Sequence, residues 1–201
     1  MTGAVPRRIL PVIVLSQFAG TSLWFAVNAV MPDLQRAWGL PPGLTREPVR
    51  MPGALAKQVY WPACFQFDAD EALIIETDIP AHAPYWNIQL NDPYFNALEY
   101  VYRLSSSNGH YAKLSRDGKY RAVIALEDPG VPNWLDPAGY REGGIYGRWY
   151  DCDSEPLPTL KRVKLSELRD HLPTDTSVVT PEERAEELRV RVRACQRRRR
   201  W

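Results

Sequence analysis

A tryptophan on a stiff loop is the first residue of this chain whose type and setting could bind a small molecule. Trp134 and its neighbour Asn133 follow two prolines, which restrict the backbone of the loop that carries them. A tryptophan on such a loop can plug one end of a β-structure, or it can present a stacking face to a ligand. The sequence leaves both interpretations open.

Arg148 is the second candidate. It lies in a segment with strand-like alternation, so it shares one face of that strand with Tyr146 and Tyr150. An arginine there is either paired with a carboxylate at a sheet edge or free to meet a ligand. Together with Trp134 and an aromatic turn, it could form a site for a small hydrophobic or sugar-like substrate. The candidate ligand-binding residues are Tyr94, Phe95, Asn133, Trp134, Arg148 and Tyr150.

Catalytic and metal-binding patterns are missing from the sequence. The acidic clusters lie where strands are expected to end and lack the spacing of a calcium loop, so we expect them to face water. The three histidines, His82, His110 and His171, are isolated from one another. No Gly-x-Ser-x-Gly motif, phosphate loop or dinucleotide fingerprint is present. We therefore predict no catalytic residues, no metal and no cofactor, and the acidic clusters are Asp68, Asp70 and Glu71, and Asp151, Cys152, Asp153 and Glu155.

The cysteines and the net charge set further limits. Cys64, Cys152 and Cys195 show no CxxC spacing, so they are unrelated thiols, or Cys64 and Cys152 form one disulfide in an oxidising compartment. The net charge is +1, from 25 basic and 24 acidic residues. A global field that would attract nucleic acid or an acidic substrate is therefore not expected.

Short runs of alternating residues separated by turn residues dominate the chain after residue 53. They are rich in β-branched and aromatic side chains, which predicts a mainly β fold, an antiparallel β-sandwich. The dipeptides Asn108-Gly109 and Asp117-Gly118 are typical of turns that need positive φ. The predicted strands are Val59–Phe67, Leu73–Thr77, Trp86–Leu90, Tyr120–Leu126, Ile145–Tyr150 and Leu160–Leu165.

Only the C-terminal region has a clear helical pattern. Thr180 is suited to the N-cap, Pro181 to the first helical position, and Glu183 completes a capping box. Ala185, Leu188, Val192 and Cys195 recur at spacings of three and four, and we expect this stripe to dock on the sandwich.

The N-terminal segment has the composition of a membrane span. Ile9 to Met31 contains no ionisable side chain over 23 residues and includes Trp24 and Asn28. As a helix it would be roughly 34 Å long, enough for a hydrocarbon core of about 30 Å. The preceding Arg7 and Arg8 favour a cytoplasmic N-terminus. The segment is either a retained signal anchor or a cleaved signal peptide, with Val27 and Ala29 at the small-residue positions.

Two stretches of the sequence resemble known protein families. VLSQFAGTSLWFAVNAVMPDLQRAWGLP resembles the first transmembrane helix and loop of a major facilitator superfamily transporter, over residues 9–40. No second charge-free apolar stretch follows, so one chain could not enclose a transport pathway. This resemblance leaves open that the segment is the truncated or fused remnant of a transporter.

The second resemblance covers residues 55–165. DGKYRAVIALEDPGVPNWLDPAGYREGGIYGRWYDCD, with YWNIQLNDPYFNALEYVYR upstream, is similar to the bacterial family called domain of unknown function 1214. The resemblance implies an antiparallel, jelly-roll-like fold and no established activity. The matching positions are Asp117, Gly118, Pro129, Asn133, Trp134, Leu135, Gly139, Arg148 and Tyr150.

The arginine-rich tail suggests a possible lipid contact. Arg197, Arg198, Arg199 and Arg200 precede Trp201, and such clusters either stay solvated or bind anionic lipid. Nucleic acid is a weaker alternative because the domain is expected outside the cytoplasm.

These observations define four expected regions. Residues 1–40 form a transmembrane or signal-anchor segment, 41–53 a Pro/Gly-rich linker, 54–178 the β-sandwich, and 179–201 the helix with its arginine-rich end. We expect a single-pass cell-membrane protein with an extracytoplasmic domain, or a secreted one if the segment is cleaved. The expected role is a binding or accessory module of the bacterial envelope, with a small-molecule ligand. The alternatives are an enzyme for a small hydrophobic or sugar-like substrate, and a transporter remnant without transport activity.

Overall fold

The structure is a computed structural model that describes residues 43, 45, 48, 50 and 55–197 of the 201. All of these residues belong to one unit that spans Leu40–Trp201. The predicted span from Ile9 to Met31, most of the predicted linker and Arg198 to Trp201 lie outside the described residues. Within the described residues, no helix has the length and apolar character needed to cross a bilayer.

The described chain forms eight strands, one 3₁₀-helix and one α-helix. In chain order they are β1 (Gln58–Gln66), β2 (Glu71–Thr77), β3 (Tyr85–Asn91), β4 (Ser106–Asn108), β5 (Tyr120–Ile124), β6 (Trp134–Leu135), β7 (Glu142–Tyr150), β8 (Thr159–Lys164), η1 (Leu165–His171) and α2 (Pro181–Gln196).

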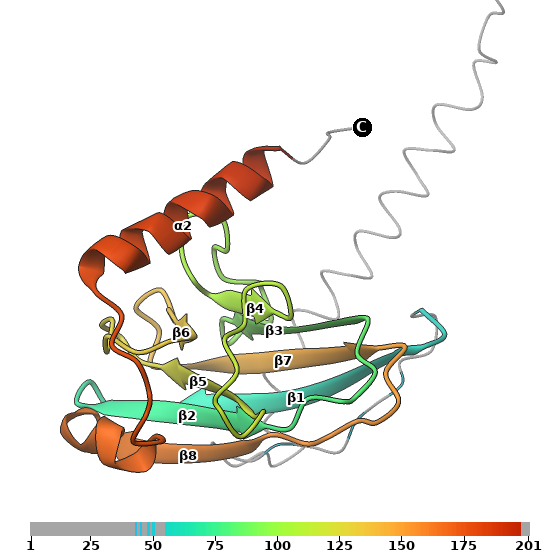
Figure 1. Ribbon diagram of the computed structural model, residues 1–201, viewed down its shortest axis with the longest axis horizontal. Coiled ribbons are helices and arrows are strands. Elements are labelled where there is room, and N and C mark those ends of the chain that lie inside the picture. The colour runs from blue at the N-terminus through green and yellow to red at the C-terminus, as the bar shows by residue number, and fades with distance from the viewer. Residues whose placement is uncertain (1–42, 44, 46–47, 49, 51–54, 198–201) are drawn as a thin grey trace, which may run out of the picture. The chain divides into compact units, whose positions relative to one another are not determined.

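The strands form two four-stranded sheets (Figure 1). Sheet A has the order β1-β7-β3-β4, and sheet B has the order β6-β5-β2-β8. All pairs in sheet A are antiparallel, so β7 lies in the middle with β1 and β3 on its two sides. In sheet B, β6 runs parallel to β5, which makes that sheet mixed.

All six predicted strands are present, with ends that differ by at most three residues. The sequence did not predict β4 and β6, because two or three residues are too few to show alternation. The parallel β6 corrects the expectation of wholly antiparallel pairing. The 3₁₀-helix η1 corrects the expectation that only the C-terminus is helical.

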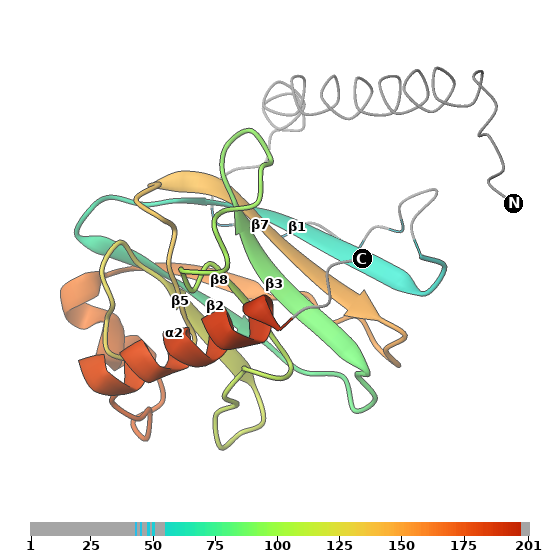
Figure 2. The ribbon, with the colours of Figure 1, turned by 90° about the horizontal axis from the view of Figure 1, so that it is seen from above.

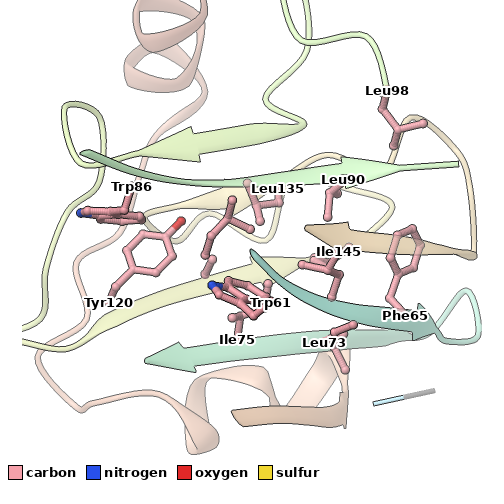
Figure 3. Packing of buried hydrophobic residues seen from close by; sticks show 14 of the residues in the cluster. Trp61, Phe65, Leu73, Ile75, Trp86, Leu90, Leu98, Tyr120, Leu135 and Ile145 are labelled. Atoms are coloured by element: carbon pink, nitrogen blue, oxygen red, sulfur yellow. The ribbon is translucent and has the colours of Figure 1, made fainter. Parts of the chain in front are cut away.

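A cluster of buried side chains from both sheets forms the main core (Figure 3). Trp61 and Phe65 come from β1 of sheet A, while Leu73 and Ile75 come from β2 of sheet B. Tyr120 of β5 lies edge-on to Trp86 of β3, with ring centroids 4.9 Å apart. Aromatic side chains thus link the two sheets across the core.

Gly147 of β7 makes room for the largest of these side chains. Trp61 is 1% exposed and stands directly opposite Gly147 in the register. A Cβ atom on Gly147 would lie 1.7 Å from Cε2 of Trp61. Only glycine can occupy this position while the indole stays where it is.

Gly109 and Gly118 are the two glycines predicted to need positive φ, and the structure gives them different roles. Gly118 has φ +81° and its N–H donates to the carbonyl of Ser115, as a turn requires. Gly109 is not among the positive-φ glycines. A Cβ atom there would lie 2.9 Å from Nε1 of Trp86, so Gly109 permits close approach rather than an unusual backbone angle.

A second buried cluster covers the opposite face of sheet B. Ile74, Val123 and Val163 of this sheet pack with Leu168 of η1 and with Leu172. The 3₁₀-helix therefore shields the side of sheet B that does not face sheet A. The edge strand β8 carries Lys161, Arg162 and Lys164, and charges of this kind discourage pairing with another chain.

Helix α2 begins as predicted. Thr180 accepts a hydrogen bond from the N–H of Glu183, and the Glu183 carboxylate accepts one from the N–H of Thr180, with Pro181 at the first position. The helix lies on one side of the two sheets and runs across them when seen from above (Figures 1 and 2).

The predicted docking stripe of α2 is wrong. Ala185 is exposed, and Leu188, Val192 and Cys195 are only half-buried. The buried residues of the helix are Arg184 and Arg191, each 8% exposed. The edges of the sheets offer carbonyls and a carboxylate at this surface, so buried arginines fit it better than aliphatic side chains do.

None of the three cysteines, all of which lie in the described part of the chain, is in a disulfide bond. Cys64 pairs with Gly144 near one end of β7, whereas Cys152 follows the other end of that strand, at Tyr150. Six residues of extended strand separate the two ends by roughly 20 Å. A Cys64 to Cys152 disulfide is therefore excluded in this fold.

Candidate functional site

The face of sheet A that points away from the core carries most of the candidate ligand-binding residues. Inward positions on β7 hold Ile145, Gly147 and Trp149, so alternation places Tyr146, Arg148 and Tyr150 on the other face. The same alternation places every second residue of β1, β3 and β4 on the face that points away from the core. We call this surface the outer face of sheet A. Its positions are Gln58, Tyr60, Pro62, Cys64, Gln66, Tyr85, Asn87, Gln89, Asn91, Ser106, Asn108, Glu142, Gly144, Tyr146, Arg148 and Tyr150.

Neutral polar and aromatic side chains dominate this face. Amides and tyrosines occupy most of its positions, and Arg148 and Glu142 are its charged residues. In a chain in which 24% of residues are charged, a solvated strand face would ordinarily hold more of them. The composition is thus closer to that of a recognition surface, where aromatic side chains and arginine are enriched.

Arg148 lies on β7, the strand between β1 and β3, two residues from the end of that strand. It has Tyr60 directly opposite on β1 and Asn87 directly opposite on β3. Its guanidinium carbon lies 5.5 Å from the centroid of the Tyr60 ring, the geometry of a cation–π contact. The Tyr60 hydroxyl accepts a hydrogen bond from Gln58, which orients the phenol.

Two buried polar atoms in this row lack hydrogen-bond partners among the described residues. They are Nε of Arg148, a donor, and Oδ1 of Asn87, an acceptor. Asn87 as a whole is only 8% exposed. Buried polar atoms normally have partners, so these two are exceptions, and they lie in a row whose arginine is only half-buried. The predicted alternative of a carboxylate partner for Arg148 is not seen in the described part of the chain.

The aromatic turn after β3 reaches the same face. Phe95 has φ +70° and packs edge-on against Tyr146, with centroids 4.4 Å apart. Its carbonyl accepts a hydrogen bond of 2.7 Å from Asn91, and Asp92 holds the turn from within. Tyr94 is 62% exposed. The turn thus places Phe95 against the outer face of sheet A and leaves Tyr94 in solvent.

Tyr150 completes the face at its other end. It is half-buried and lies opposite Tyr85 of β3, which is 44% exposed. Phe95, Arg148 and Tyr150 therefore all belong to one surface, as expected for parts of one site.

Asn133 and Trp134 lie elsewhere and have structural roles. Asn133, with φ +55°, donates to the carbonyls of Lys113 and Arg121, each at 2.7 Å, and accepts from the N–H of Lys113 at 2.9 Å. These bonds use the whole side-chain amide apart from one lone pair. Asn133 thus ties two loops to the edge of sheet B.

Trp134 is part of the same edge. Its indole N–H donates to the carbonyl of Ala125 at 2.9 Å, and the guanidinium of Arg184 lies over its ring at 5.5 Å. The structure therefore does not bring Trp134 to Arg148, and the contacts favour the plug interpretation of the loop over the ligand-stacking one. The sequence did not identify Tyr60 and Asn87 as site residues, because their position beside Arg148 depends on the pairing of β7 with β1 and β3.

Two cavities are lined mainly by residues outside the outer face of sheet A, although Tyr85 and Asn108 of that face border the second one. One of about 270 Å³ is lined in part by Arg116, Arg121, Asn133 and Asp175. Its arginines are already paired, Arg116 with Asp175 at 3.0 Å and Arg121 with Asp117 at 2.7 Å. The arginines that line this cavity thus already have ion-pair partners within the fold.

The other cavity, of about 540 Å³, is lined mainly by apolar residues with Trp86 and His110 among them. The His110 ring packs edge-on against Tyr111, with centroids 4.8 Å apart. In the described walls of the two cavities, no hydrogen bond joins a hydroxyl to a histidine or a carboxylate.

Several carboxylates of the acidic clusters named from the sequence form ion pairs. Asp70 and Glu71 face Lys164, at 2.9 and 3.4 Å, and Asp151 faces Lys57 at 2.8 Å. The hydrogen bond from Lys164 lowers the pKa of Asp70. Within the described residues, no group of three or more His, Cys, Asp or Glu side chains is arranged to hold a metal ion.

Burial is the main cause of the shifted pKa values of Cys152, Arg191 and Tyr120. Burial raises the pKa of the Cys152 thiol, and nearby carboxylates raise it further, which keeps the thiol protonated. Burial also lowers the pKa of Arg191 and raises that of Tyr120. None of these residues belongs to the outer face of sheet A.

Comparisons with known proteins give limited guidance. No family model matches the chain, and no curated protein matches it. Among solved structures, an uncharacterised protein from Burkholderia cenocepacia is 35% identical over 57% of this chain and 32% of its own, with a TM-score of 0.54. The VPA0106 protein from Vibrio parahaemolyticus is 19% identical over 50% of this chain and 28% of its own, with a TM-score of 0.41. The chain thus spans about a third of the length of the first protein, whose fold it shares over the matched part.

Proposed function

We propose that this chain is a membrane-tethered or exported β-sandwich domain that serves as a binding or accessory module of the bacterial envelope. The observation that carries the proposal is the outer face of sheet A, where Arg148 has an aromatic neighbour but no ion-pair partner among the described residues. We propose this face, rather than either cavity, as the ligand-binding surface.

The sandwich is supported by the core. Side chains from both sheets contribute to a single buried cluster, as in sheets that pack face to face. The jelly-roll-like variant and the resemblance to the domain of unknown function 1214 family remain part of the proposal. They rest on the residue pattern of positions 55–165.

The membrane tether is supported by the sequence of residues 9–31, which has the length and composition of a span. It can be tested by expressing the full chain and a variant without residues 1–40 in a bacterial host. The full chain should stay in the membrane pellet after extraction at alkaline pH, and the shortened chain should not. Equal release of both chains would contradict the tether.

The enzyme alternative has less support. Its site required Trp134, Arg148 and the Tyr94–Phe95 turn together, but Trp134 belongs to sheet B and is packed against Arg184. The transporter-remnant alternative concerns residues 9–40, and the extensive core of sheets A and B favours a domain with a role of its own.

The binding function can be tested with the full chain purified in a mild detergent. The ligand panel contains soluble envelope components: neutral and acidic oligosaccharides, peptidoglycan fragments, dicarboxylates and amino acids. A ligand that binds the native fold raises its unfolding midpoint. The proposal predicts at least one compound that raises the midpoint of the wild type but not that of Arg148→Gln. If every midpoint shift is the same in the two proteins, the outer face of sheet A is not the binding surface.

A further inference from the structure

The chemistry of the outer face of sheet A indicates which class of ligand it recognises. We infer, resting on the proposed function, that the ligand is an acidic sugar: a glycan unit that carries a carboxylate and neighbouring hydroxyl groups.

The charged residues of the outer face of sheet A indicate a ligand with a single anionic group. Arg148 lies two residues before the end of β7, and Glu142, the other charged residue of the face, is six residues away at the start of β7, or roughly 20 Å along the strand. A guanidinium presents its donors in a fork that matches a carboxylate in bidentate geometry. One isolated cation suits one carboxylate, whereas nucleic acid or a polyphosphate would require a cluster of cations.

The amides around Arg148 suit hydroxyl groups. A hydroxyl donates one hydrogen bond and accepts others, so it pairs equally with the donor and the acceptor of a side-chain amide. Gln89 follows Asn87 on the same face of β3, and Gln58 lies beside Tyr60 on β1. A ligand with several hydroxyls could use these groups together.

The tyrosines add flat apolar surface next to the polar groups. Tyr60 and Tyr150 are half-buried, so each ring has an accessible part. Binding sites commonly combine aromatic surface with a few placed polar groups. The pyranose ring has both an apolar face and a polar rim, which matches this mixture.

A peptide fits the surface less well. Extended peptides usually bind by adding a strand to an open sheet edge, with main-chain hydrogen bonds. The groups described here project from the middle of the sheet, where β1 and β3 already satisfy the backbone of β7. Recognition must therefore come from side chains.

The test is the binding of trigalacturonic acid to the full chain in mild detergent, measured by titration calorimetry. The matched neutral probe is maltotriose. We expect trigalacturonic acid to bind at least ~10-fold more tightly than maltotriose, because a hydrogen-bonded ion pair to Arg148 contributes a difference of about 10- to 100-fold. Affinity for the acidic sugar should fall as salt is added.

Two variants examine the role of Arg148. Arg148→Gln removes the cation, and Asn87→Asp supplies a carboxylate directly opposite Arg148 in the register. Both should weaken trigalacturonic acid binding by about 10- to 100-fold. Asn87→Asp should keep the unfolding midpoint of the wild type or raise it, so its loss of binding would not reflect loss of folding. The control, Arg162→Gln, removes an arginine from edge strand β8 and should bind as the wild type does.

The inference is overturned if the neutral sugar binds as tightly as the acidic one, or if Arg148→Gln and Asn87→Asp bind the acidic sugar as the wild type does. If trigalacturonic acid fails but another class in the panel still depends on Arg148, the ligand class is wrong and the binding surface stands. If no class depends on Arg148, both proposals fail.

Discussion

Arg184 and Arg191 lie two helical turns apart on one face of α2, and each anchors the helix to a different sheet. Arg184 donates two hydrogen bonds, of 2.8 and 3.1 Å, to the carboxylate of Asp128. It also donates to the carbonyl of Val131 at 2.6 Å, in the loop just before β6 of sheet B. Arg191 donates to the hydroxyl and the carbonyl of Ser106, in β4 of sheet A.

The strands β4 and β6 are the edges of their sheets on the side of the molecule where α2 lies (Figure 1). An open edge presents unpaired N–H and C=O groups that can pair with another chain. The two arginines therefore hold helix α2 over both edge strands. The helix thus links sheets A and B at this side.

Removing Arg184 should destabilise the fold markedly. Arg184→Ala leaves the Asp128 carboxylate and the Val131 carbonyl without their partner, and we expect a loss of about 2–3 kcal/mol, less than for a fully buried pair because Asp128 keeps contact with water. Urea denaturation of the full chain measures this loss. The control Arg189→Ala breaks an exposed pair with Glu186 and should cost no more than about 0.5 kcal/mol. Similar losses in the two variants would contradict the anchoring role.

Gly147 should tolerate no larger side chain while Trp61 is present. Gly147→Ala would drive a Cβ atom into the indole, and we expect a loss of at least about 3 kcal/mol in unfolding free energy. Trp61→Phe removes the ring atoms nearest to that Cβ. The double variant should therefore be more stable than the sum of the two single losses predicts, by at least about 1 kcal/mol. Strict additivity would show that the two residues do not compete for the same space.

Asn133 should matter for stability and not for ligand binding. Asn133→Gly keeps the positive φ but loses three hydrogen bonds, at a cost of about 2–3 kcal/mol. Asn133→Ala should cost about 1 kcal/mol more, because alanine disfavours the left-handed backbone. Thermal and urea unfolding separate the two effects. Affinity for trigalacturonic acid should remain that of the wild type, and a selective loss of binding in a stably folded Asn133→Gly would return this residue to the ligand site.

Acid should weaken the fold through Asp117. Hydrogen bonds from Arg121 and from the N–H of Lys119 lower the pKa of Asp117 from 3.8 to about 2. A carboxyl group whose pKa is lower in the folded state stabilises that state above the unfolded pKa, and the contribution disappears as the pH falls from about 4 to about 2. Urea midpoints measured across this range should decline less steeply in Asp117→Asn than in the wild type. An equal slope in Asp117→Asn and the wild type would contradict the assignment.

Alternation predicted the strands well because each one has one face against the core. In β1 the buried and half-buried residues alternate from Gln58 to Phe65, which is the pattern that period-two analysis detects. The capping box of α2 was also predictable, since Thr180, Pro181 and Glu183 act within one turn of each other. Local signals of this kind need no knowledge of the tertiary structure.

The errors arose where tertiary contacts decide. The apolar stripe of α2 gave way to Arg184 and Arg191, because their partners, Asp128 and Ser106, are far away in the sequence. Likewise, the sequence offers Trp134 and Arg148 equally as candidate ligand-binding residues. Only the pairing of the strands in the two sheets shows that they belong to different surfaces. Cross-strand neighbours such as Tyr60 and Asn87 emerge only when β7 is placed between β1 and β3.

The binding surface can be located most directly from the side-chain signals of Arg148 and Trp134. A proton–nitrogen correlation spectrum of the nitrogen-labelled full chain shows arginine Nε–H and tryptophan indole groups, and Arg148→Gln and Trp134→Phe assign the two signals. The account predicts that trigalacturonic acid, or whichever panel compound binds, moves the Arg148 signal and leaves the indole of Trp134, held by Ala125, in place. Movement of the Trp134 signal with an unchanged Arg148 signal would contradict the account and place the ligand at the edge of sheet B.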